Sequence, residues 1–288
     1  MHPLLSDLES AVRAAAMYLI DVAASKEEAR SWIKPDGSLL LSLDLACDKI
    51  LVDKLLDVAP IVSEERVGTH HLIDSDEDYL VIDPIDGTAA CKRFLRTLGG
   101  QVGFGPLVGL ISKRRVEMAV FYQVPHRTLF TAIRGQGVRA VALPNPATPA
   151  PRFQTRPRLR GSPATQLRES VMLYFMGQGR EGPVVESLKL SGAVENAYRF
   201  GGFANDCARL AQGLEDLQLQ LSVKPWDFAA TLFPRETGYV TVMDPFGRRV
   251  PYDEWDIAEE NPVLVAPPHL IEEFLAAVVG ARAEVIKE

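Results

Sequence analysis

Two aspartates, Asp83 and Asp86, follow an apolar run and are separated by a proline and an isoleucine. The apolar run, residues 79–82, has the composition of a buried strand. A carboxylate at the end of such a strand must be paired or bound to a metal, because an uncompensated buried charge is costly. Hard divalent cations such as Mg²⁺ prefer oxygens of this kind. Gly87 then allows a sharp turn with room for a ligand, and Thr88 adds a hydroxyl beside the candidate metal.

Two other segments of the chain end in acidic residues. Glu64 and Glu65 come shortly after the apolar pair 61–62, and Asp227 follows the Lys-Pro-Trp run 224–226. Taken singly, a Glu-Glu pair is typical of the surface, an Asp/Pro/Gly stretch of a turn, and Trp-Asp of a helix cap. Their joint occurrence favours a metal site, because a site for two metals needs several carboxylates that converge from different elements.

These motifs resemble those of the inositol monophosphatase superfamily, which includes fructose-1,6-bisphosphatase, the bacterial 3′(2′),5′-bisphosphate nucleotidases and histidinol-phosphate phosphatase. The resemblance rests on Ser63-Glu64-Glu65, on Asp83-Pro84-Ile85-Asp86-Gly87-Thr88 and on Trp226-Asp227-Phe228-Ala229-Ala230, and it extends from about residue 5 to about residue 245. It implies an α/β protein with the layered αβαβα sugar-phosphatase-like sandwich. It also implies a Mg²⁺-dependent phosphomonoesterase that hydrolyses a small phosphorylated sugar, polyol or nucleotide with a metal-activated water.

The resemblance also implies a role for each matching residue. Asp44 and Thr88 are implied to orient and deprotonate the attacking water, and Glu65 to hold a bridging water or the water of a third metal. The amides of Gly87 and Thr88 are implied to bind phosphate. Two or three Mg²⁺ ions, with Mn²⁺ as an alternative, are implied for each site. The residues implied to bind them are Glu64, Asp83, the carbonyl of Ile85, Asp86 and Asp227.

The expected substrate pocket departs from the superfamily pattern. Gly202 stands where a serine or threonine often touches the substrate, and Ala90 also lacks a polar side chain. Gln220 stands seven residues before Asp227, where true inositol phosphatases have a glutamate that binds inositol hydroxyls. We therefore expect Gly202 and Gln220 to line an altered pocket, and we expect inositol phosphate to be a poorer substrate than another sugar or nucleotide phosphate.

Composition sets the remaining expectations. The net charge of −7 argues against binding to a nucleic acid polymer, which requires a basic face, but permits a small anionic substrate held by metals. Cys47, Cys91 and Cys207 form no zinc motif and no disulfide pattern, so a cytoplasmic location is expected. No signal peptide and no membrane span are expected. His70 and His71 are interpreted as part of a loop after a strand, in preference to a transition-metal site.

Periodicity and turn signals predict the elements that position these residues. Asp44 is expected to be the N-cap of a helix, and a tight turn is expected at 34–37. Helices are expected at 4–30, 45–58, 184–190, 203–214, from 226, and at 268–280, and strands at 61–62, 79–82, 102–111, 116–122, 128–133, 217–223 and 239–243.

A proline-rich stretch divides the chain at about 144–163 and is predicted to be a linker. Residues 1–143 then form an N-terminal α+β lobe with most of the metal ligands, and residues 164–288 form a C-terminal α/β lobe that completes the site. The resemblance implies a homodimer. Two alternatives to an enzyme stay open: a catalytically weak homologue that senses a phosphorylated metabolite, and an interaction protein built on an enzyme scaffold.

Overall fold

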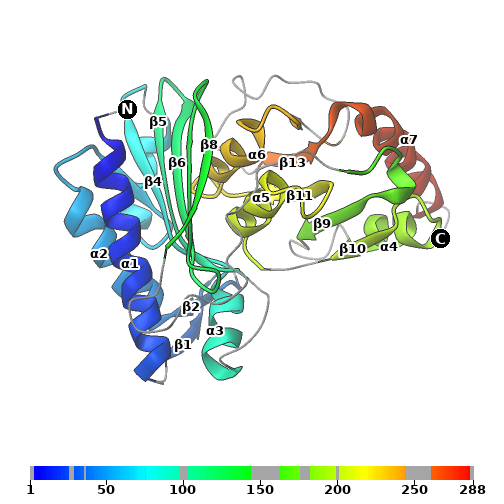
Figure 1. Ribbon diagram of the computed structural model, residues 1–288. Helices are drawn as coiled ribbons and strands as arrows, with labels where there is room; N and C mark the ends of the chain where they lie inside the picture. Colours follow the sequence, from blue (N-terminus) through cyan, green and yellow to red (C-terminus); the bar gives the residue numbers. More distant parts are fainter. Residues whose placement is uncertain are drawn as a thin grey trace.

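Five alternating layers of helix and sheet make up the protein (Figure 1). The computed structural model describes residues 3–25, 29–35, 37–74, 76–97, 103–143, 163–175, 182–198, 201–243, 245 and 261–285. Apolar side chains fill the spaces between successive layers in three clusters. The layers follow one another as helices, sheet, helices, sheet, helices, and the predicted αβαβα sandwich is confirmed.

The first sheet is a nearly continuous meander that carries the two central aspartates. Its order is β3-β4-β5-β6-β7-β8, with β3 parallel to β4 and the other neighbours antiparallel. Every residue of β4 is buried, because helices cover both faces of the sheet. The strands are β3 (Ile61–Ser63), β4 (Tyr79–Asp86), β5 (Gly105–Ser112), β6 (Arg115–Gln123), β7 (Thr128–Ile133) and β8 (Gly137–Ala142).

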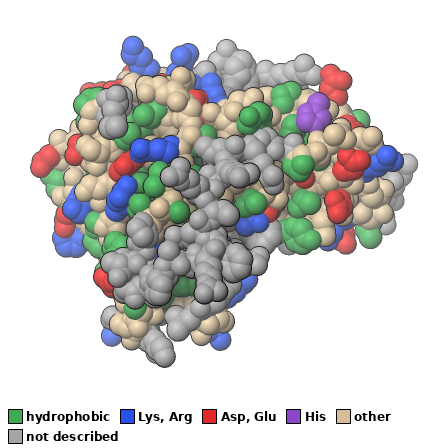
Figure 2. All heavy atoms as spheres, viewed as in Figure 1, with side chains coloured by type: hydrophobic (Ala, Val, Ile, Leu, Met, Phe, Trp, Pro, Cys, Tyr) green, Lys and Arg blue, Asp and Glu red, His purple; other side chains and the backbone are tan. Residues whose placement is uncertain are grey.

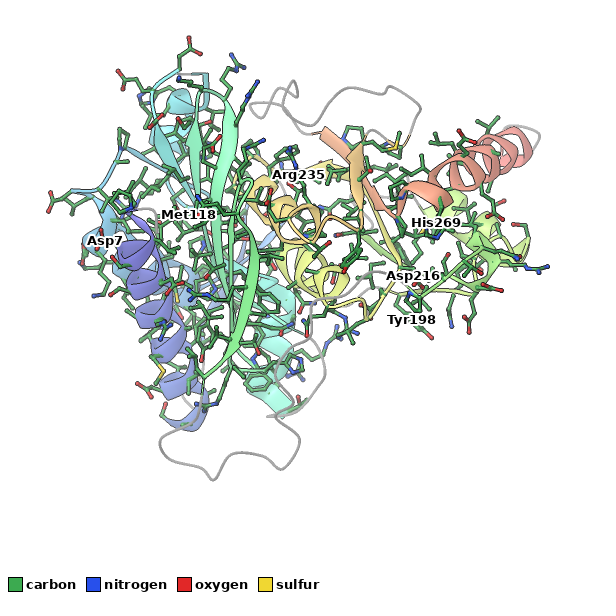
Figure 3. The ribbon with its side chains drawn as sticks, turned by 45° about the horizontal axis from the view of Figure 1, so that its top comes forward. Asp7, Met118, Tyr198, Asp216, Arg235 and His269 are labelled. Carbon is green, nitrogen blue, oxygen red and sulfur yellow. The ribbon has the colours of Figure 1, made fainter. Side chains whose placement is uncertain are left out.

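Helices α1 (Leu5–Ser25) and α2 (Ser42–Leu55) cover the outer face of this sheet (Figure 1). In α1, Leu8, Val12 and Leu19 are buried at helical spacing and belong to the same apolar cluster as Met118 of β6, which is labelled in Figure 3. The described part of α1 ends at Ser25, short of the predicted residue 30; residues 26–28 lie outside the described residues.

The start of α2 corrects the prediction that Asp44 is its N-cap. The N-cap is Leu41, and Asp44 lies in the first turn of the helix. The Asp44 carboxylate accepts the backbone N–H of Leu41 at 2.6 Å, which is the reach-back half of a capping box. A carboxylate can accept a backbone N–H from the first turn of a helix as well as from the N-cap position. The residue type alone therefore does not distinguish the two positions.

The second sheet lies beyond a middle layer of helices and has the order β10-β9-β11-β13-β12. Helices α4 (Gly182–Leu190) and α7 (Pro268–Val285) cover its outer face, where Leu217, Leu219 and Phe274 are buried together. Three of its strands were not predicted, because short apolar runs cannot be assigned by periodicity alone. The strands are β9 (Val171–Phe175), β10 (Asn196–Tyr198), β11 (Leu217–Val223), β12 (Thr241–Met243) and β13 (Asn261–Ala266).

The middle layer consists of α5 (Phe203–Ala211), the 3₁₀ helix η3 (Phe228–Thr231) and α6 (Leu232–Arg235). These helices are buried on almost all sides because a sheet covers each face of the layer. Aromatic rings join α6 to the first sheet: the ring centroid of Phe233 lies 6.4 Å from that of Phe121 and 6.0 Å from that of Phe130.

Several smaller elements complete the described structure. The hairpin β1 (Ser31–Ile33) and β2 (Leu39–Leu41) lies beside α3 (Thr88–Thr97), and the 3₁₀ helix η1 (Val67–Asp74) follows β3. A further 3₁₀ turn, η2 (Leu167–Glu169), precedes β9. The predicted linker lies almost entirely outside the described residues, so the division into two lobes stays a prediction.

The surface carries acidic and basic side chains side by side on the face shown in Figure 2. Among the described residues, no helix is both long and apolar enough to cross a membrane.

The contact between η3 and the first sheet gives a testable prediction. A Cβ at Gly109 of β5 would lie 2.3 Å from the Ala229 Cβ and 3.0 Å from a Val81 methyl. Gly109→Ala should therefore push η3 away from β5 and destabilise the fold by about 1–3 kcal/mol, the usual cost of overpacking. Urea unfolding measures the change.

Gly68→Ala is the matched control, because a Cβ there would meet nothing within 4 Å. The urea midpoint of this variant should equal or exceed that of the wild type. Equal midpoints for Gly109→Ala and the wild type would contradict the close packing of η3 on β5.

Candidate functional site

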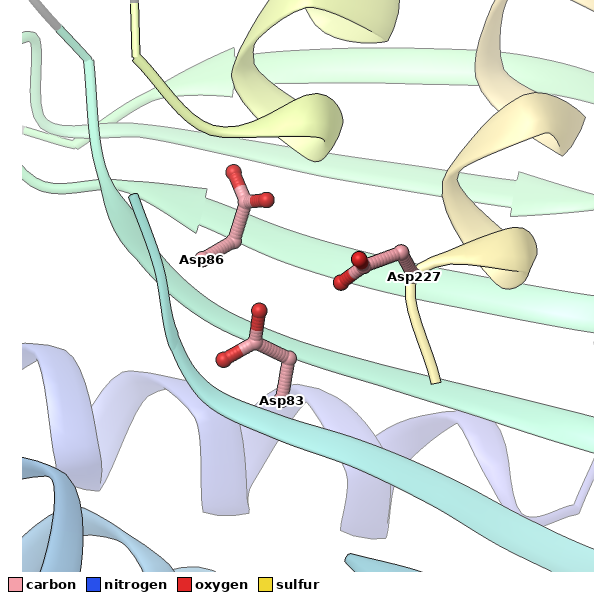
Figure 4. Close-up of side chains that lie close together, drawn as sticks. All are labelled: Asp83, Asp86 and Asp227. Carbon is pink, nitrogen blue, oxygen red and sulfur yellow. The ribbon is translucent and has the colours of Figure 1, made fainter. Parts of the chain in front are cut away.

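Three carboxylates converge at the end of β4, as Figure 4 shows. Asp83, Asp86 and Asp227 each offer an oxygen, and these oxygens all lie within 4.8 Å of one another. Residues three apart on a regular strand point to opposite faces. The register of β4 against β5 shifts between Asp83 and Asp86, and this irregularity brings both carboxylates to one side.

Asp227 reaches the cluster from the second half of the chain. It lies in the turn that leads into η3, which packs on β5 at Gly109. The structure thus brings together three of the five predicted metal ligands, and Asp227 lies 141 positions after Asp86 in the chain (227 − 86). Their assignment as ligands stays a prediction.

Asp86 is held by the first turn of α5. Its Oδ2 accepts the backbone N–H of Asn205 at 3.1 Å, and the amides of Phe203 and Ala204 also bond to the carboxylate. A Cβ at Gly202 would lie 2.0 Å from the Asp86 Oδ2, so this approach requires a glycine. Gly202 was predicted to touch substrate; the contact found here is with Asp86, and its substrate role stays a prediction.

A fourth carboxylate, that of Asp44, lies beside a hydroxyl, as the predicted water-activating pair requires. The Thr88 hydroxyl donates to Asp44 Oδ1 at 3.2 Å and also lies 3.2 Å from the carbonyl oxygen of Ile85, a predicted metal ligand. The other Asp44 oxygen is occupied by the Leu41 amide. Asp44 is therefore oriented by its own helix, with one oxygen left for Thr88.

Gly87 forms the turn between β4 and α3. Its φ of +85° is in the left-handed region, and a Cβ there would meet the backbone of Gly202 at 3.0 Å. Thr88 is the first residue of α3, so the amides of Gly87 and Thr88 lie at a helix N-terminus, where anions bind favourably. This placement agrees with their predicted role in phosphate binding, which stays a prediction.

The two predicted glutamates are paired with a lysine that the sequence did not mark as a site residue. Lys34, in the turn between β1 and β2, donates to Glu64 and Glu65 at 2.7 Å each. Burial lowers the pKa of Lys34, but the charge of Glu64 and the hydrogen bonds to both glutamates outweigh it and raise the pKa above its usual value. A lysine before a Pro-Asp-Gly turn carries no signal of its tertiary contacts, so only the structure reveals this pair.

Burial raises the pKa values of the four aspartates of the site. It raises the pKa of Asp44 to about 7 and, against three backbone amides, that of Asp86 to about 7. The pKa values of Asp83 and Asp227 are raised well above the ordinary range by burial and by neighbouring negative charges, Glu64 among them. A bound cation would stabilise the ionised form of these acids and so lower their pKa values.

Gln220 lies on β11, on the opposite face from Leu217 and Leu219, and so faces the middle helices. Its amide nitrogen donates to the Ser222 carbonyl at 3.1 Å, while its buried carbonyl oxygen has no hydrogen-bond partner within the described part of the chain. On the same face, Gln218 accepts the Cys207 thiol at 3.4 Å. Among the described residues, Gln220 makes no hydrogen bond to the carboxylate cluster.

Comparison with known proteins decides the family. The model of the inositol monophosphatase family matches residues 4–283, nearly the whole chain. The chain belongs to this family. Family membership supports a phosphatase and confirms the resemblance inferred from the motifs; the substrate does not follow from it.

Individual relatives agree with the family assignment. Nus factor SuhB of Salmonella typhimurium is 29% identical over 246 residues, 83% of this chain and 84% of that protein. The structure of the suppressor protein SuhB from Bartonella henselae superposes with a TM-score of 0.74 at 21% identity, covering 96% and 98% of the two chains. An IMPase/NADP phosphatase complexed with Mg²⁺ and phosphate superposes with a TM-score of 0.68 at 17% identity, covering 94% and 95%.

The raised pKa values predict how the stability of the metal-free protein depends on pH. Asp44 and Asp86 shift from 3.8 to about 7 on folding, so between these values the folded state binds more protons than the unfolded state. Their contribution to stability is fully present below about pH 4 and is lost as the pH rises through about 7. Thermal unfolding in EDTA at pH 5, 6, 7 and 8 should show falling midpoints.

Added Mg²⁺ should raise the midpoint more at pH 8 than at pH 5, because the cation binds the deprotonated carboxylates. Asp86→Asn should flatten the pH dependence in EDTA, since it removes one titrating group. A midpoint in EDTA that rises from pH 5 to pH 8 would contradict the raised pKa values.

Proposed function

We propose that this protein is a Mg²⁺-dependent phosphomonoesterase that hydrolyses a small phosphorylated sugar, polyol or nucleotide. The observation that carries the proposal is the convergence of Asp83, Asp86 and Asp227 next to the Thr88–Asp44 hydrogen bond. A phosphate monoester is an anion and water is a poor nucleophile, so hydrolysis requires both charge neutralisation and activation of water. Membership of the inositol monophosphatase family supports the same reaction.

The donor set fits a hard divalent cation. The cluster offers carboxylate oxygens only, and burial has raised the pKa of each of its acids. Asp83, Asp86 and Asp227 would hold Mg²⁺ or Mn²⁺, with Glu64 and the Ile85 carbonyl as further ligands for two or three ions. When bound, the ions supply neutralisation of the phosphate, a lower pKa for water and stabilisation of the leaving oxygen.

Residues of the chain itself activate the water and bind the phosphate. The Thr88 hydroxyl positions the attacking water and relays its proton to Asp44, whose pKa of about 7 suits a general base near neutral pH. Glu65, held by Lys34, orients a further water. The amides of Gly87 and Thr88 bind the phosphate oxygens at the start of α3.

The pocket is proposed to use Gln220 in place of a charged acceptor. Its buried carbonyl oxygen lacks a partner in the described part of the chain, and a substrate hydroxyl would supply one. An amide gives a weaker bond to a hydroxyl than a carboxylate does, and Gly202 offers no side chain. Both features disfavour an inositol ring.

The alternative function, a sensor of a phosphorylated metabolite, predicts a different result in an activity assay. A panel of sugar, inositol and nucleotide phosphates is tested for phosphate release with Mg²⁺ and with EDTA, and binding is measured in parallel. Tight binding of a phosphorylated metabolite without turnover would replace the enzyme by the sensor. The absence of a nucleic acid polymer partner, the homodimer and the cytoplasmic location stay predictions, and a relative with the name Nus factor leaves the first of these open.

Asp83→Asn should abolish turnover, because it removes a carboxylate proposed to be shared by two metals and leaves a neutral amide in the cluster. Thr88→Ala should still bind Mg²⁺ with near wild-type affinity but lower kcat by roughly 10²–10⁴-fold, the range for loss of a positioned proton relay. Phosphate release and calorimetric Mg²⁺ titration measure the two effects.

The exposed Asp78, next to β4, provides the control, and Asp78→Asn should keep wild-type turnover. Full activity in EDTA, or a near wild-type kcat for Asp83→Asn, would show that the proposed metal site is wrong.

Specificity gives a separate prediction. Inositol 1-phosphate should have a lower kcat/KM than the best sugar or nucleotide phosphate at fixed Mg²⁺, because Gln220 and Gly202 replace polar partners of the inositol ring. Gln220→Glu should raise the relative kcat/KM for inositol 1-phosphate, whereas Gln218→Glu on the same strand should not. An inositol 1-phosphate value tenfold above every other substrate would contradict this reading of the pocket and leave the metal site untouched.

A further inference from the structure

His70 in η1 touches two segments that the metal site depends on. Its Nε2 lies 2.9 Å from the carbonyl oxygen of Ser63, and because a carbonyl only accepts, Nε2 carries the proton and donates. Its ring lies against the indole of Trp226, with the centroids 5.1 Å apart and the planes tilted by 38°. The single side chain therefore connects the end of β3 with the turn before η3.

Each partner of His70 directly precedes a proposed metal ligand. Ser63 is followed by Glu64, and Trp226 is followed by Asp227. More than 150 residues separate the two ligands in the chain, since they are numbered 64 and 227. Their separation in space is set by packing, and the histidine lies between the two backbones that carry them.

The bond to Ser63 acts on the peptide unit that carries Glu64. The Ser63 carbonyl and the Glu64 N–H belong to one planar group. The Glu64 N–H donates to the Ile82 carbonyl of β4 at 3.1 Å, and the Ser63 carbonyl accepts from His70 on the other side. The Ser63 hydroxyl also donates to Asp48 of α2 at 2.5 Å. The orientation of Glu64 is thus fixed from both edges of its peptide plane.

We infer that His70 is a positioning residue for the metal site, which holds the Glu64 and Asp227 segments in register with each other. The inference rests on the proposed metal-dependent function. Groups outside the ligand shell that orient metal ligands typically change metal affinity or activity by about 10–100-fold when they are removed. The ring does not touch the reacting atoms, so its removal should act on the ions and leave the contacts to the substrate unchanged.

Three substitutions separate the two contacts of the histidine. His70→Gln keeps a side-chain donor but loses the ring, His70→Phe keeps the ring against Trp226 but loses the donor, and His70→Ala loses both. Calorimetric titration of the metal-free protein with Mg²⁺ should show a Kd about tenfold higher for His70→Ala, with the other two variants between it and the wild type. At saturating Mg²⁺ the KM for substrate should stay within twofold of the wild-type value.

His71 provides the matched control. It is the neighbouring histidine of the same 3₁₀ helix, is exposed, and its Nδ1 lies 2.9 Å from the carbonyl of Gly68 within that helix. His71→Ala should leave the Kd for Mg²⁺ unchanged. Thermal unfolding in EDTA is measured for every variant, and His70→Phe keeps most of the ring volume in case His70→Ala is poorly folded.

The outcomes are distinguishable. A lower unfolding midpoint with an unchanged Kd for Mg²⁺ in all three His70 variants would make the histidine merely structural and overturn the inference alone. A wild-type protein that binds no Mg²⁺ would overturn both the inference and the proposed function. A graded rise in Kd in the His70 variants, absent in His71→Ala, supports the positioning role.

Discussion

The mutual repulsion of buried carboxylates is the constraint on which the rest of the structure depends. Asp83, Asp86 and Asp227 place oxygens within 4.8 Å of one another; Asp83 and Asp86 are buried and Asp227 is half-buried. Two full charges at 4 Å repel by about 4 kcal/mol at an effective dielectric constant near 20, so the cluster costs stability unless protons or cations compensate it. The raised pKa values of these acids express the same cost in the metal-free protein.

The scaffold withstands this repulsion because each acid lies on an element that is held in place by other contacts. β4 is buried along its whole length between two strands of the first sheet. The first amides of α5 bond to Asp86, and η3 brings Asp227 onto β5 through the contact of Ala229 with Gly109. The layers that surround the cluster are therefore needed to hold charges that would otherwise move apart.

The parts of this arrangement that could be predicted from the sequence are the local ones. Asp83, Asp86, Gly87 and Thr88 lie in one short segment, so their motif and the family could be recognised without knowledge of any tertiary contact. The layered fold followed from the family, whereas the strands β9, β10 and β13 did not follow from periodicity. The bond of Lys34 to both glutamates joins residues 30 and 31 positions apart, and no local pattern encodes it.

The proposed metal site and the proposed substrate pocket also meet at one residue, Gly202. Gly202 has no side chain, and the Asp86 carboxylate lies where its Cβ would be and accepts the Asn205 amide there. A serine at this position would need Asp86 to move, because its Cβ would lie 2.0 Å from the Asp86 Oδ2. The glycine at position 202 and the placement of the Asp86 carboxylate therefore depend on each other in this chain, so a residue expected to line the pocket also shapes the proposed metal site.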